Sequence, residues 1–110
     1  MIKAIAITLS LLFYSLQGFA GEQTVTVIAK GYKFEPAEIT VKVGTKVRWE
    51  NQEKRQYHSV YFESLGDPEG NYLFPGDSRE VTFTEPGTYP FICEPHVKSH
   101  GMKGVVRVVE

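Results

Sequence analysis

The chain has 110 residues, a formal net charge of −1 and a single cysteine. This length limits it to one domain with one modest hydrophobic core. The balanced charge gives no electrostatic reason to expect nucleic acid or an anionic membrane as a partner. One cysteine cannot form an internal disulfide, so the core must hold without that crosslink.

The N-terminus has the pattern of a secretory signal peptide. Lys3 precedes an apolar run at residues 4–14, and the small residues Gly18 and Ala20 follow at the spacing that signal peptidase accepts. We therefore predict a signal peptide at residues 1–20. Its cleavage removes Lys3 and changes the formal net charge from −1 to −2.

The alternative for this segment is a membrane anchor. A spanning helix needs about 20 consecutive apolar residues, and Gln17 with Gly18 interrupts the run before that length. We therefore expect residues 21–110 to form a single exported domain, periplasmic or in an equivalent compartment, that has no membrane span and is monomeric.

The rest of the chain has the pattern of an all-β protein. Short runs rich in β-branched and aromatic residues are separated by Gly and Pro turn signals. They lie at residues 23–30, 39–43, 46–50, 58–62, 79–84, 88–93 and 105–109. This spacing predicts a β-sandwich or barrel of about seven to eight strands. Residues 63–74 fit neither helix nor strand and stay unassigned.

Alternation within these runs places two metal-binding residue types at the ends of core-facing rows. Cys93 continues the row of Tyr89 and Phe91, and His58 begins the row that contains Val60. A sandwich brings such strand ends together. The stretch "FICEPHVKSHGM" at residues 91–102 adds further histidines and a methionine. Thiolate, imidazole and thioether groups are the donors that soft and borderline metals prefer.

The motifs together resemble one family. The segments "FEPAEITVKVGTKVRWEN", "YHSV", "PGTYPFICEPH" and "GMKGVVRV", in this order, are similar to the small blue copper proteins, the cupredoxins of plastocyanin, pseudoazurin and halocyanin type. The resemblance covers about residues 31–110. It implies a Greek-key β-sandwich, one type 1 copper ion, and copper ligands at His58, Cys93, His96 and Met102.

The resemblance also implies a function. Two imidazoles, a thiolate and a weak axial thioether suit both Cu(I) and Cu(II), so such a site exchanges single electrons with little rearrangement. We expect an electron shuttle between redox proteins, such as a c-type cytochrome or an oxidoreductase, that docks near His96. We expect a positive rim around this surface that Glu53 and Glu94 weaken, so that electrostatic steering is modest; its cationic residues are Lys54, Arg55, Lys98 and Lys103.

Two details depart from the family pattern. Five residues separate His96 from Met102, where plastocyanins and pseudoazurins have four, so His100 competes with Met102 as the axial ligand. The family often has Asn after its first histidine, bonded to the residue after the cysteine. Here these positions are Ser59 and Glu94, and we expect the serine hydroxyl to donate to the Glu94 carboxylate.

Other functions fit the sequence less well. Covalent haem requires C-x-x-C-H, and a structural zinc site usually has more cysteines in paired spacing. A copper enzyme needs an open site or a second copper, for which only His100 is left, so we expect no enzymatic activity. The alternative is a periplasmic copper carrier or donor that has no electron-shuttle role.

Overall fold

The computed structural model describes residues 23–110, and secondary structure in this part of the chain is almost entirely strand. The strands are β1 (Thr24–Lys30), β2 (Lys33–Glu35), β3 (Glu38–Lys42), β4 (Lys46–Asn51), β5 (His58–Ser59), β6 (Tyr72–Leu73), β7 (Ser78–Thr82), β8 (Gly87–Ile92) and β9 (Lys103–Val109). A 3₁₀ turn, η1 (Glu63–Leu65), and a one-turn helix, α2 (Val97–His100), complete the described elements. The predicted signal peptide at residues 1–20 lies outside the described residues.

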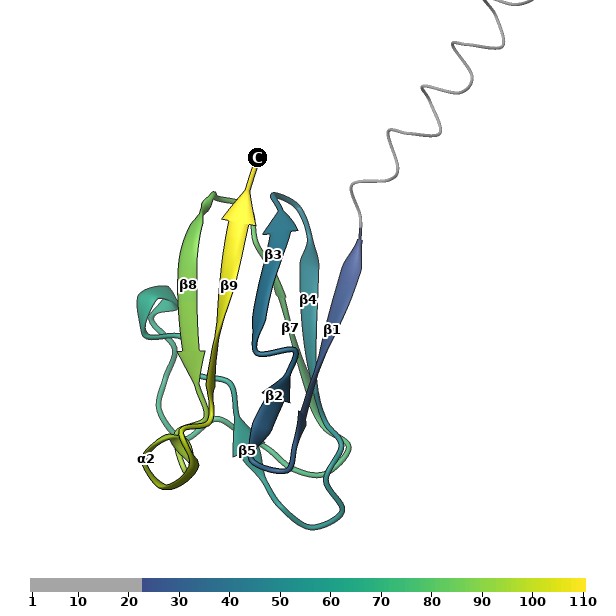
Figure 1. Cartoon of the computed structure of the whole chain (residues 1–110), viewed down its shortest axis with the longest axis vertical. Helices are drawn as coiled ribbons and strands as arrows, with labels where there is room; N and C mark the ends of the chain where they lie inside the picture. Colours follow the sequence, from purple (N-terminus) through teal and green to yellow (C-terminus); the bar gives the residue numbers. More distant parts are fainter. Residues whose placement is uncertain (1–22) are drawn as a thin grey trace, which may run out of the picture.

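Two sheets pack face to face, as the alternating strand pattern predicted. The first has the order β2-β1-β4-β7, and the second has the order β3-β9-β8. The strands β1 and β4 are parallel, as are β3 and β9, and the remaining pairs in these sheets are antiparallel. Figure 1 shows β2, β5 and α2 at the same end of the two sheets, away from the C-terminus. Within residues 23–110, no helix has the length and apolar character needed to cross a bilayer.

The core is built where aromatic side chains from both sheets meet. Trp49 of β4 is fully buried, and its ring lies edge-on to Phe62 at 5.5 Å and to Phe91 of β8 at 5.3 Å between centroids. Each buried aromatic side chain of this kind contributes roughly 2–3 kcal/mol through removal of apolar area from water. The buried valines on alternate positions of β1, β4 and β9 fill the space around the three rings.

The number of strands differs from the prediction because three of them are very short. Nine strands occur in residues 23–110, and β2, β5 and β6 have only two or three residues each. Runs of this length contain too few residues for an alternating pattern, so the sequence did not reveal β2 and β6. The strand predicted at residues 58–62 is shorter than expected, since β5 ends at Ser59 and only Tyr61 bridges to Ile92 beyond it.

The unassigned segment 63–74 is a connection that leads from η1 to β6. Strand β6 returns the chain to β5, where Leu73 pairs with His58. An ion pair fixes the start of the connection, because the Asp67 carboxylate accepts hydrogen bonds from Arg79 Nη1 (2.6 Å) and Nη2 (2.9 Å). It also accepts one from the Phe62 amide at 2.8 Å. The clamp therefore ties the chain that follows β5 to β7.

The loop between β4 and β5 is organised by a buried asparagine at the end of β4. Asn51 donates from Nδ2 to the carbonyl oxygens of Gln56 (2.9 Å) and Leu73 (2.8 Å). Its Oδ1 accepts from the Glu53 amide at 2.9 Å. Since every polar atom of this side chain is paired, Asn51 holds the 52–57 loop against the short strands β5 and β6.

Candidate metal centre

Three side chains of metal-binding type converge at the end of the sandwich that contains β5 and α2. His58 begins β5, Cys93 directly follows β8, and His96 precedes α2. The ligand atoms of these three residues all lie within 4.8 Å of one another. His58 and Cys93 are fully buried, and His96 is 8% exposed. The structure therefore brings together three of the four residues that the sequence indicated.

The three ligand atoms form a small triangle. His58 Nδ1 lies 3.2 Å from His96 Nδ1, and Cys93 Sγ lies 3.7 Å and 3.4 Å from these two nitrogens. The centre of such a triangle is about 2 Å from each corner. This distance is close to the bond lengths that imidazole and thiolate ligands make to a first-row transition metal such as zinc. Two imidazoles and one thiolate in trigonal arrangement are the donor set of type 1 copper. The residues therefore fit a copper ion.

Glu53 orients the His58 ring. The outer nitrogen, His58 Nε2, lies 2.9 Å from Glu53 Oε2, which also accepts the Gly31 amide at 2.9 Å. Burial by itself raises the pKa of Glu53, but the hydrogen bonds from His58 and Gly31 outweigh it and hold this pKa below its ordinary value. An ionised Glu53 keeps the proton of the neutral ring on Nε2. The lone pair of His58 Nδ1 then points into the triangle.

The Cys93 thiol lies in an environment that favours its protonated form when no metal is bound. Burial raises the pKa of Cys93 above its ordinary value, although the Ser59 amide donates to its sulfur at 3.3 Å. Metal binding must therefore displace a proton, and affinity falls as the pH is lowered. The amide contact from Ser59 stabilises the charge of the resulting thiolate.

His96 is held in the neutral form that ligation requires. Its burial lowers its pKa, and the neighbouring His58 and His100 rings lower it further. The outer nitrogen, His96 Nε2, lies 3.2 Å from the side-chain amide of Gln56. With His96 Nδ1 in the triangle, Nε2 carries the proton and donates, so the Gln56 amide must present its oxygen to this ring.

The two candidates for the axial position lie in different environments. Met102 is 1% exposed and is part of the core cluster, and its backbone contacts both neighbouring ligands, through Cys93 N at 3.0 Å and His96 O at 3.4 Å. His100 is exposed, and its ring stacks on Tyr32 at 3.7 Å with an angle of 3° between the planes. The ring of His100 is therefore engaged outside the triangle.

Comparison with known proteins gives a family for this arrangement. The model of the cupredoxin-like domain matches residues 3–108. Plastocyanin from Scenedesmus fuscus is 36% identical over 85 residues, which cover 68% of this chain and 85% of that protein. Amicyanin-alpha from Methylorubrum extorquens is 40% identical over 77 residues, which cover 66% of this chain and 63% of that protein.

A solved structure agrees with these relatives. The reduced state of an amicyanin mutant superposes with a TM-score of 0.68 at 34% identity and covers 78% of this chain and 82% of that one. The chain belongs to the cupredoxin family. The resemblance that the sequence motifs indicated is thereby confirmed, as is the all-β sandwich class.

The extra residue in the ligand loop of this cupredoxin is accommodated by α2. The His100 amide donates to the His96 carbonyl at 2.9 Å, and the Gly101 amide donates to the Val97 carbonyl at the same distance. Gly101 then reverses the chain with a φ of 63°, a conformation that glycine adopts without strain. The residues between His96 and Gly101 therefore form a helical turn at the surface, and the chain then brings Met102 back beside His96 and Cys93.

The expected hydrogen bond between Ser59 and Glu94, which we call the Ser59 clasp, is present, but its donor and acceptor differ from our expectation. The Ser59 hydroxyl accepts a hydrogen bond from the Glu94 backbone amide at 2.9 Å and does not donate to the Glu94 carboxylate. That carboxylate instead accepts the Gly70 amide at 3.3 Å. A partly buried backbone N–H needs an acceptor within the protein, whereas the Glu94 carboxylate can be solvated by water, so the serine hydroxyl pairs with the N–H.

The sequence did not reveal the groups that contact the outer histidine nitrogens of this cupredoxin. Glu53 and Gln56 lie in a polar loop with no regular pattern, and their role depends on how Asn51 folds that loop. The sequence also did not reveal Tyr32, which lies edge-on to the His96 ring and is placed by a tight turn between β1 and β2 in which Gly31 and Tyr32 both have positive φ. The spacing of Glu53 five residues before His58 is the one feature of the sequence that could have indicated their contact.

Proposed function

We propose that this cupredoxin is an exported type 1 copper protein that carries single electrons between redox proteins. Copper is the cofactor, and we assign His58 Nδ1, Cys93 Sγ and His96 Nδ1 as its equatorial ligands. The observation that supports this assignment is the buried triangle of two imidazole nitrogens and one thiolate sulfur. Met102 is proposed as the axial ligand because it is buried beside this triangle.

The protein matrix keeps the ligands in one arrangement. A bound copper ion supplies a one-electron Cu(II)/Cu(I) couple. Glu53 and Gln56 fix the two rings from outside, and the amide hydrogen bond from Ser59 stabilises the thiolate charge. Because the ligands come from a strand and a loop that the sandwich holds rigidly, they move little when the charge of the site changes. A small rearrangement is what rapid electron exchange requires.

Aromatic side chains surround the exposed edge of His96 and form a surface on which a partner protein could dock. Tyr32 lies edge-on to the His96 ring at 4.9 Å, and Tyr57 lies 6.2 Å from it. Tyr72 and Phe74 extend this group from Tyr57, at 5.0 Å and 6.0 Å. The last three side chains are 38%, 40% and 56% exposed. Their exposure favours an aromatic docking surface that extends outward from His96.

We further propose that the mature domain comprises residues 21–110, acts as a monomer in the periplasm, and exchanges electrons with proteins such as a c-type cytochrome. It is proposed to have no enzymatic activity. The signal-like N-terminus and the single ligand cluster found in the described residues support this view.

Visible spectroscopy separates electron transfer from copper transport. The copper-loaded protein should show an intense visible band when it is oxidised and should bleach reversibly on reduction. A protein that only transports copper would hold Cu(I) without colour. The band arises from the thiolate bond, so Cys93→Ser should remove it while circular dichroism stays that of a β-sandwich. A Ser99→Ala variant, altered on the exposed side of α2, serves as the matched control and should keep the band.

A further inference from the structure

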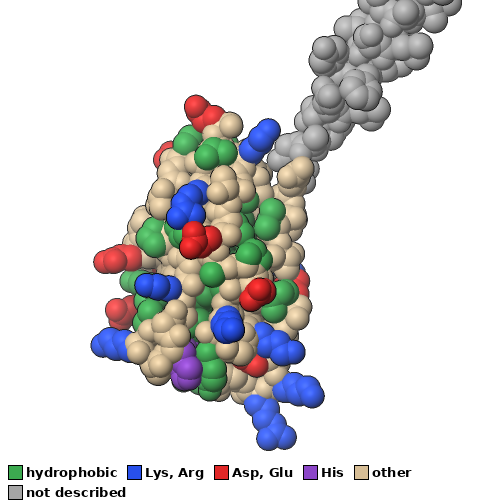
Figure 2. Space-filling model, in the orientation of Figure 1, with side chains coloured by type: hydrophobic (Ala, Val, Ile, Leu, Met, Phe, Trp, Pro, Cys, Tyr) green, Lys and Arg blue, Asp and Glu red, His purple; other side chains and the backbone are tan. Residues whose placement is uncertain are grey.

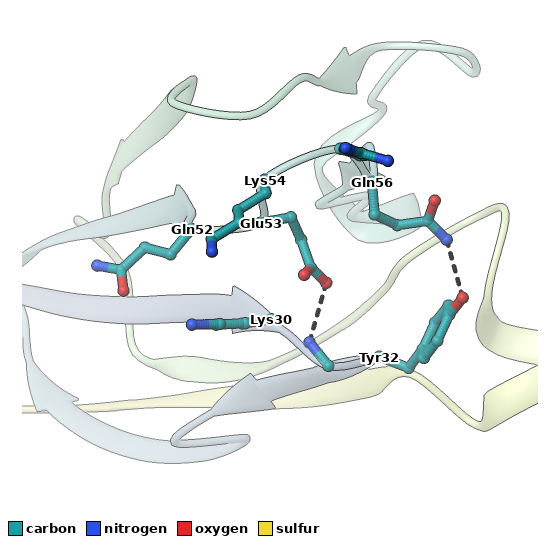
Figure 3. A pocket seen from close by; sticks show the side chains of 8 residues that line it. Lys30, Tyr32, Gln52, Glu53, Lys54 and Gln56 are labelled. Carbon is teal, nitrogen blue, oxygen red and sulfur yellow. Dashed lines mark hydrogen bonds between the residues drawn. The ribbon is translucent and has the colours of Figure 1, made fainter.

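A cavity of about 700 Å³ opens beside the metal centre, between the β1–β2 turn and the 52–57 loop. Figure 3 shows side chains from both segments facing one another across it. Its lining consists of Lys30, Gly31, Tyr32, Gln52, Glu53, Lys54, Arg55 and Gln56. We call it the cationic cavity, because three of these eight residues are positively charged and only one is negatively charged.

The positive charges of the cationic cavity form no ion pair within residues 23–110. Lys30, Lys54 and Arg55 are exposed and take part in no salt bridge among residues 23–110. The carboxylate of Glu53 already accepts hydrogen bonds from Gly31 and His58. Figure 2 shows Lys and Arg side chains gathered over this end of the molecule, although the whole chain carries a net charge of −1. The cavity therefore attracts anionic groups.

Two residues of the cationic cavity contact the outer nitrogens of both histidines in the metal centre. Glu53 Oε2 lies 2.9 Å from His58 Nε2, and the Gln56 amide lies 3.2 Å from His96 Nε2. The same end of the Gln56 amide lies 3.0 Å from the Tyr32 hydroxyl. A group bound in the cavity is thus one side chain away from either ligand ring. The remaining cations at this end, such as Lys33 and Lys103, line a different hollow beside His100 and Met102.

We propose that the cationic cavity binds carboxylate side chains on the surface of an acidic redox partner, and that this contact sets the orientation in which electrons pass. The proposal rests on the proposed electron-transfer function. Unpaired lysine and arginine around a polar cavity complement Asp and Glu of a partner. The partner then covers Glu53 and Gln56, next to His58 and His96, while the aromatic surface at Tyr57 forms the other side of the interface.

The test compares two variants that lose the same charge from different places. The cavity variant carries Lys30→Gln, Lys54→Gln and Arg55→Gln, and the control variant carries Lys33→Gln, Lys42→Gln and Lys46→Gln, which are exposed outside the cavity and the rim. Both are prepared with copper, and their spectra and reduction potentials are compared with the unmodified protein first. A protein that lacked the visible band or reversible reduction would overturn the electron-transfer function itself, and this result is separate from any effect on docking.

Stopped-flow oxidation of the reduced proteins by an acidic c-type cytochrome then measures docking. At low ionic strength, we expect the cavity variant to react about tenfold more slowly than the unmodified protein and the control variant to react within about twofold of it. A basic c-type cytochrome should not be slowed by the cavity substitutions. Equal slowing of both variants would show a general charge effect and would overturn the proposal.

A redox-inert anion maps the site without electron transfer. Paramagnetic hexacyanochromate(III), added to the reduced protein, should broaden the amide NMR signals of residues 30–32 and 52–56 most strongly, and the cavity variant should lose this broadening. Broadening centred on residues 98–103, or none near the cavity, would contradict the proposed site.

Discussion

Glu53 and Gln56 support the two ligand histidines in chemically different ways. A carboxylate contacts His58 Nε2, and a neutral amide contacts His96 Nε2. A negative charge on the outer nitrogen makes the inner nitrogen a stronger donor, so His58 should be the more firmly bound ligand. His96, with a neutral partner and an edge at the surface, is the better placed of the two for contact with a partner protein.

Removal of the Glu53 charge tests this difference. In Glu53→Gln the ring keeps a hydrogen-bond acceptor but loses the carboxylate, so Cu(II) should bind about 10- to 100-fold more weakly and the reduction potential should rise. Competition titrations with a chelator and voltammetry measure the two effects. Glu35→Gln removes an exposed carboxylate from the neighbouring strand β2 and is the control. Similar behaviour of both variants would mean that Glu53 acts only through its overall charge.

The axial ligand is the second question at the level of single residues. Because Met102 is buried beside the ligand loop and the His100 ring stacks on Tyr32, we expect Met102→Leu to raise the potential and keep the colour, and His100→Ala to change neither strongly. Voltammetry and visible absorption of both variants decide the matter. A large spectral change in His100→Ala, with none in Met102→Leu, would make the histidine the fourth ligand.

The secondary structure shows where prediction from sequence succeeds. Alternation correctly predicted that Phe91 of β8, and Cys93 directly after this strand, are buried on the same side, because a strand that faces a core on one side repeats every two residues. The same rule placed His58 in one row with Val60, and both are buried, but Ser59 between them is buried as well. There the core covers one side of the chain and the ligand loop covers the other, so exposed and buried side chains do not alternate.

Long-range contacts of irregular segments were beyond sequence reasoning. The contacts of Glu53 and Gln56 with the histidines arise from Asn51, whose side chain folds the loop through three hydrogen bonds. The chemistry of the Ser59 clasp likewise depended on which group of Glu94 faces the hydroxyl, and composition cannot decide this. The proposed ligands His58, Cys93 and His96 could be selected from the sequence because their donor types, their order and the motifs that flank them resemble the family pattern.

The Asp67–Arg79 clamp should make the connection after β5 sensitive to acid. Burial alone raises the pKa of Asp67, but the hydrogen bonds from Arg79 and Phe62 outweigh it and hold this pKa below its ordinary value. A carboxylate whose pKa is lowered by folding stabilises the protein above its unfolded-state pKa. This contribution is lost as the pH falls through the folded-state pKa.

We therefore expect Asp67→Asn to cost about 2 kcal/mol near pH 7, a typical value for hydrogen bonds to a charged group. The difference from the unmodified protein should shrink as the pH is lowered below about 4. Urea unfolding of the apoprotein at several pH values measures this, with the exposed Glu69→Gln as the control. If the loss of unfolding free energy in Asp67→Asn stayed constant down to the lowest pH, the charge of Asp67 would not contribute to stability.

For the whole molecule, the metal centre joins elements that are far apart in the sequence. His58 begins β5, whereas Cys93, His96 and Met102 lie in the connection between β8 and β9. A ligand that binds only the folded state stabilises it by mass action, by about 4 kcal/mol when its free concentration is a thousandfold above Kd. For a domain of this size, this corresponds to a rise of roughly 20 °C in Tm.

Copper removal should therefore lower Tm by about this amount without unfolding the protein, since the aromatic core around Trp49 does not depend on the metal. Calorimetry and circular dichroism of the apoprotein and the copper-loaded protein provide the measurement. Cys93→Ser, which keeps the two imidazoles but lacks the thiolate, should show a much smaller difference between its two forms. If the unmodified protein melted at the same temperature with and without copper, the metal would be bound outside the folded site, and the assignment of His58, Cys93 and His96 as its ligands would fail.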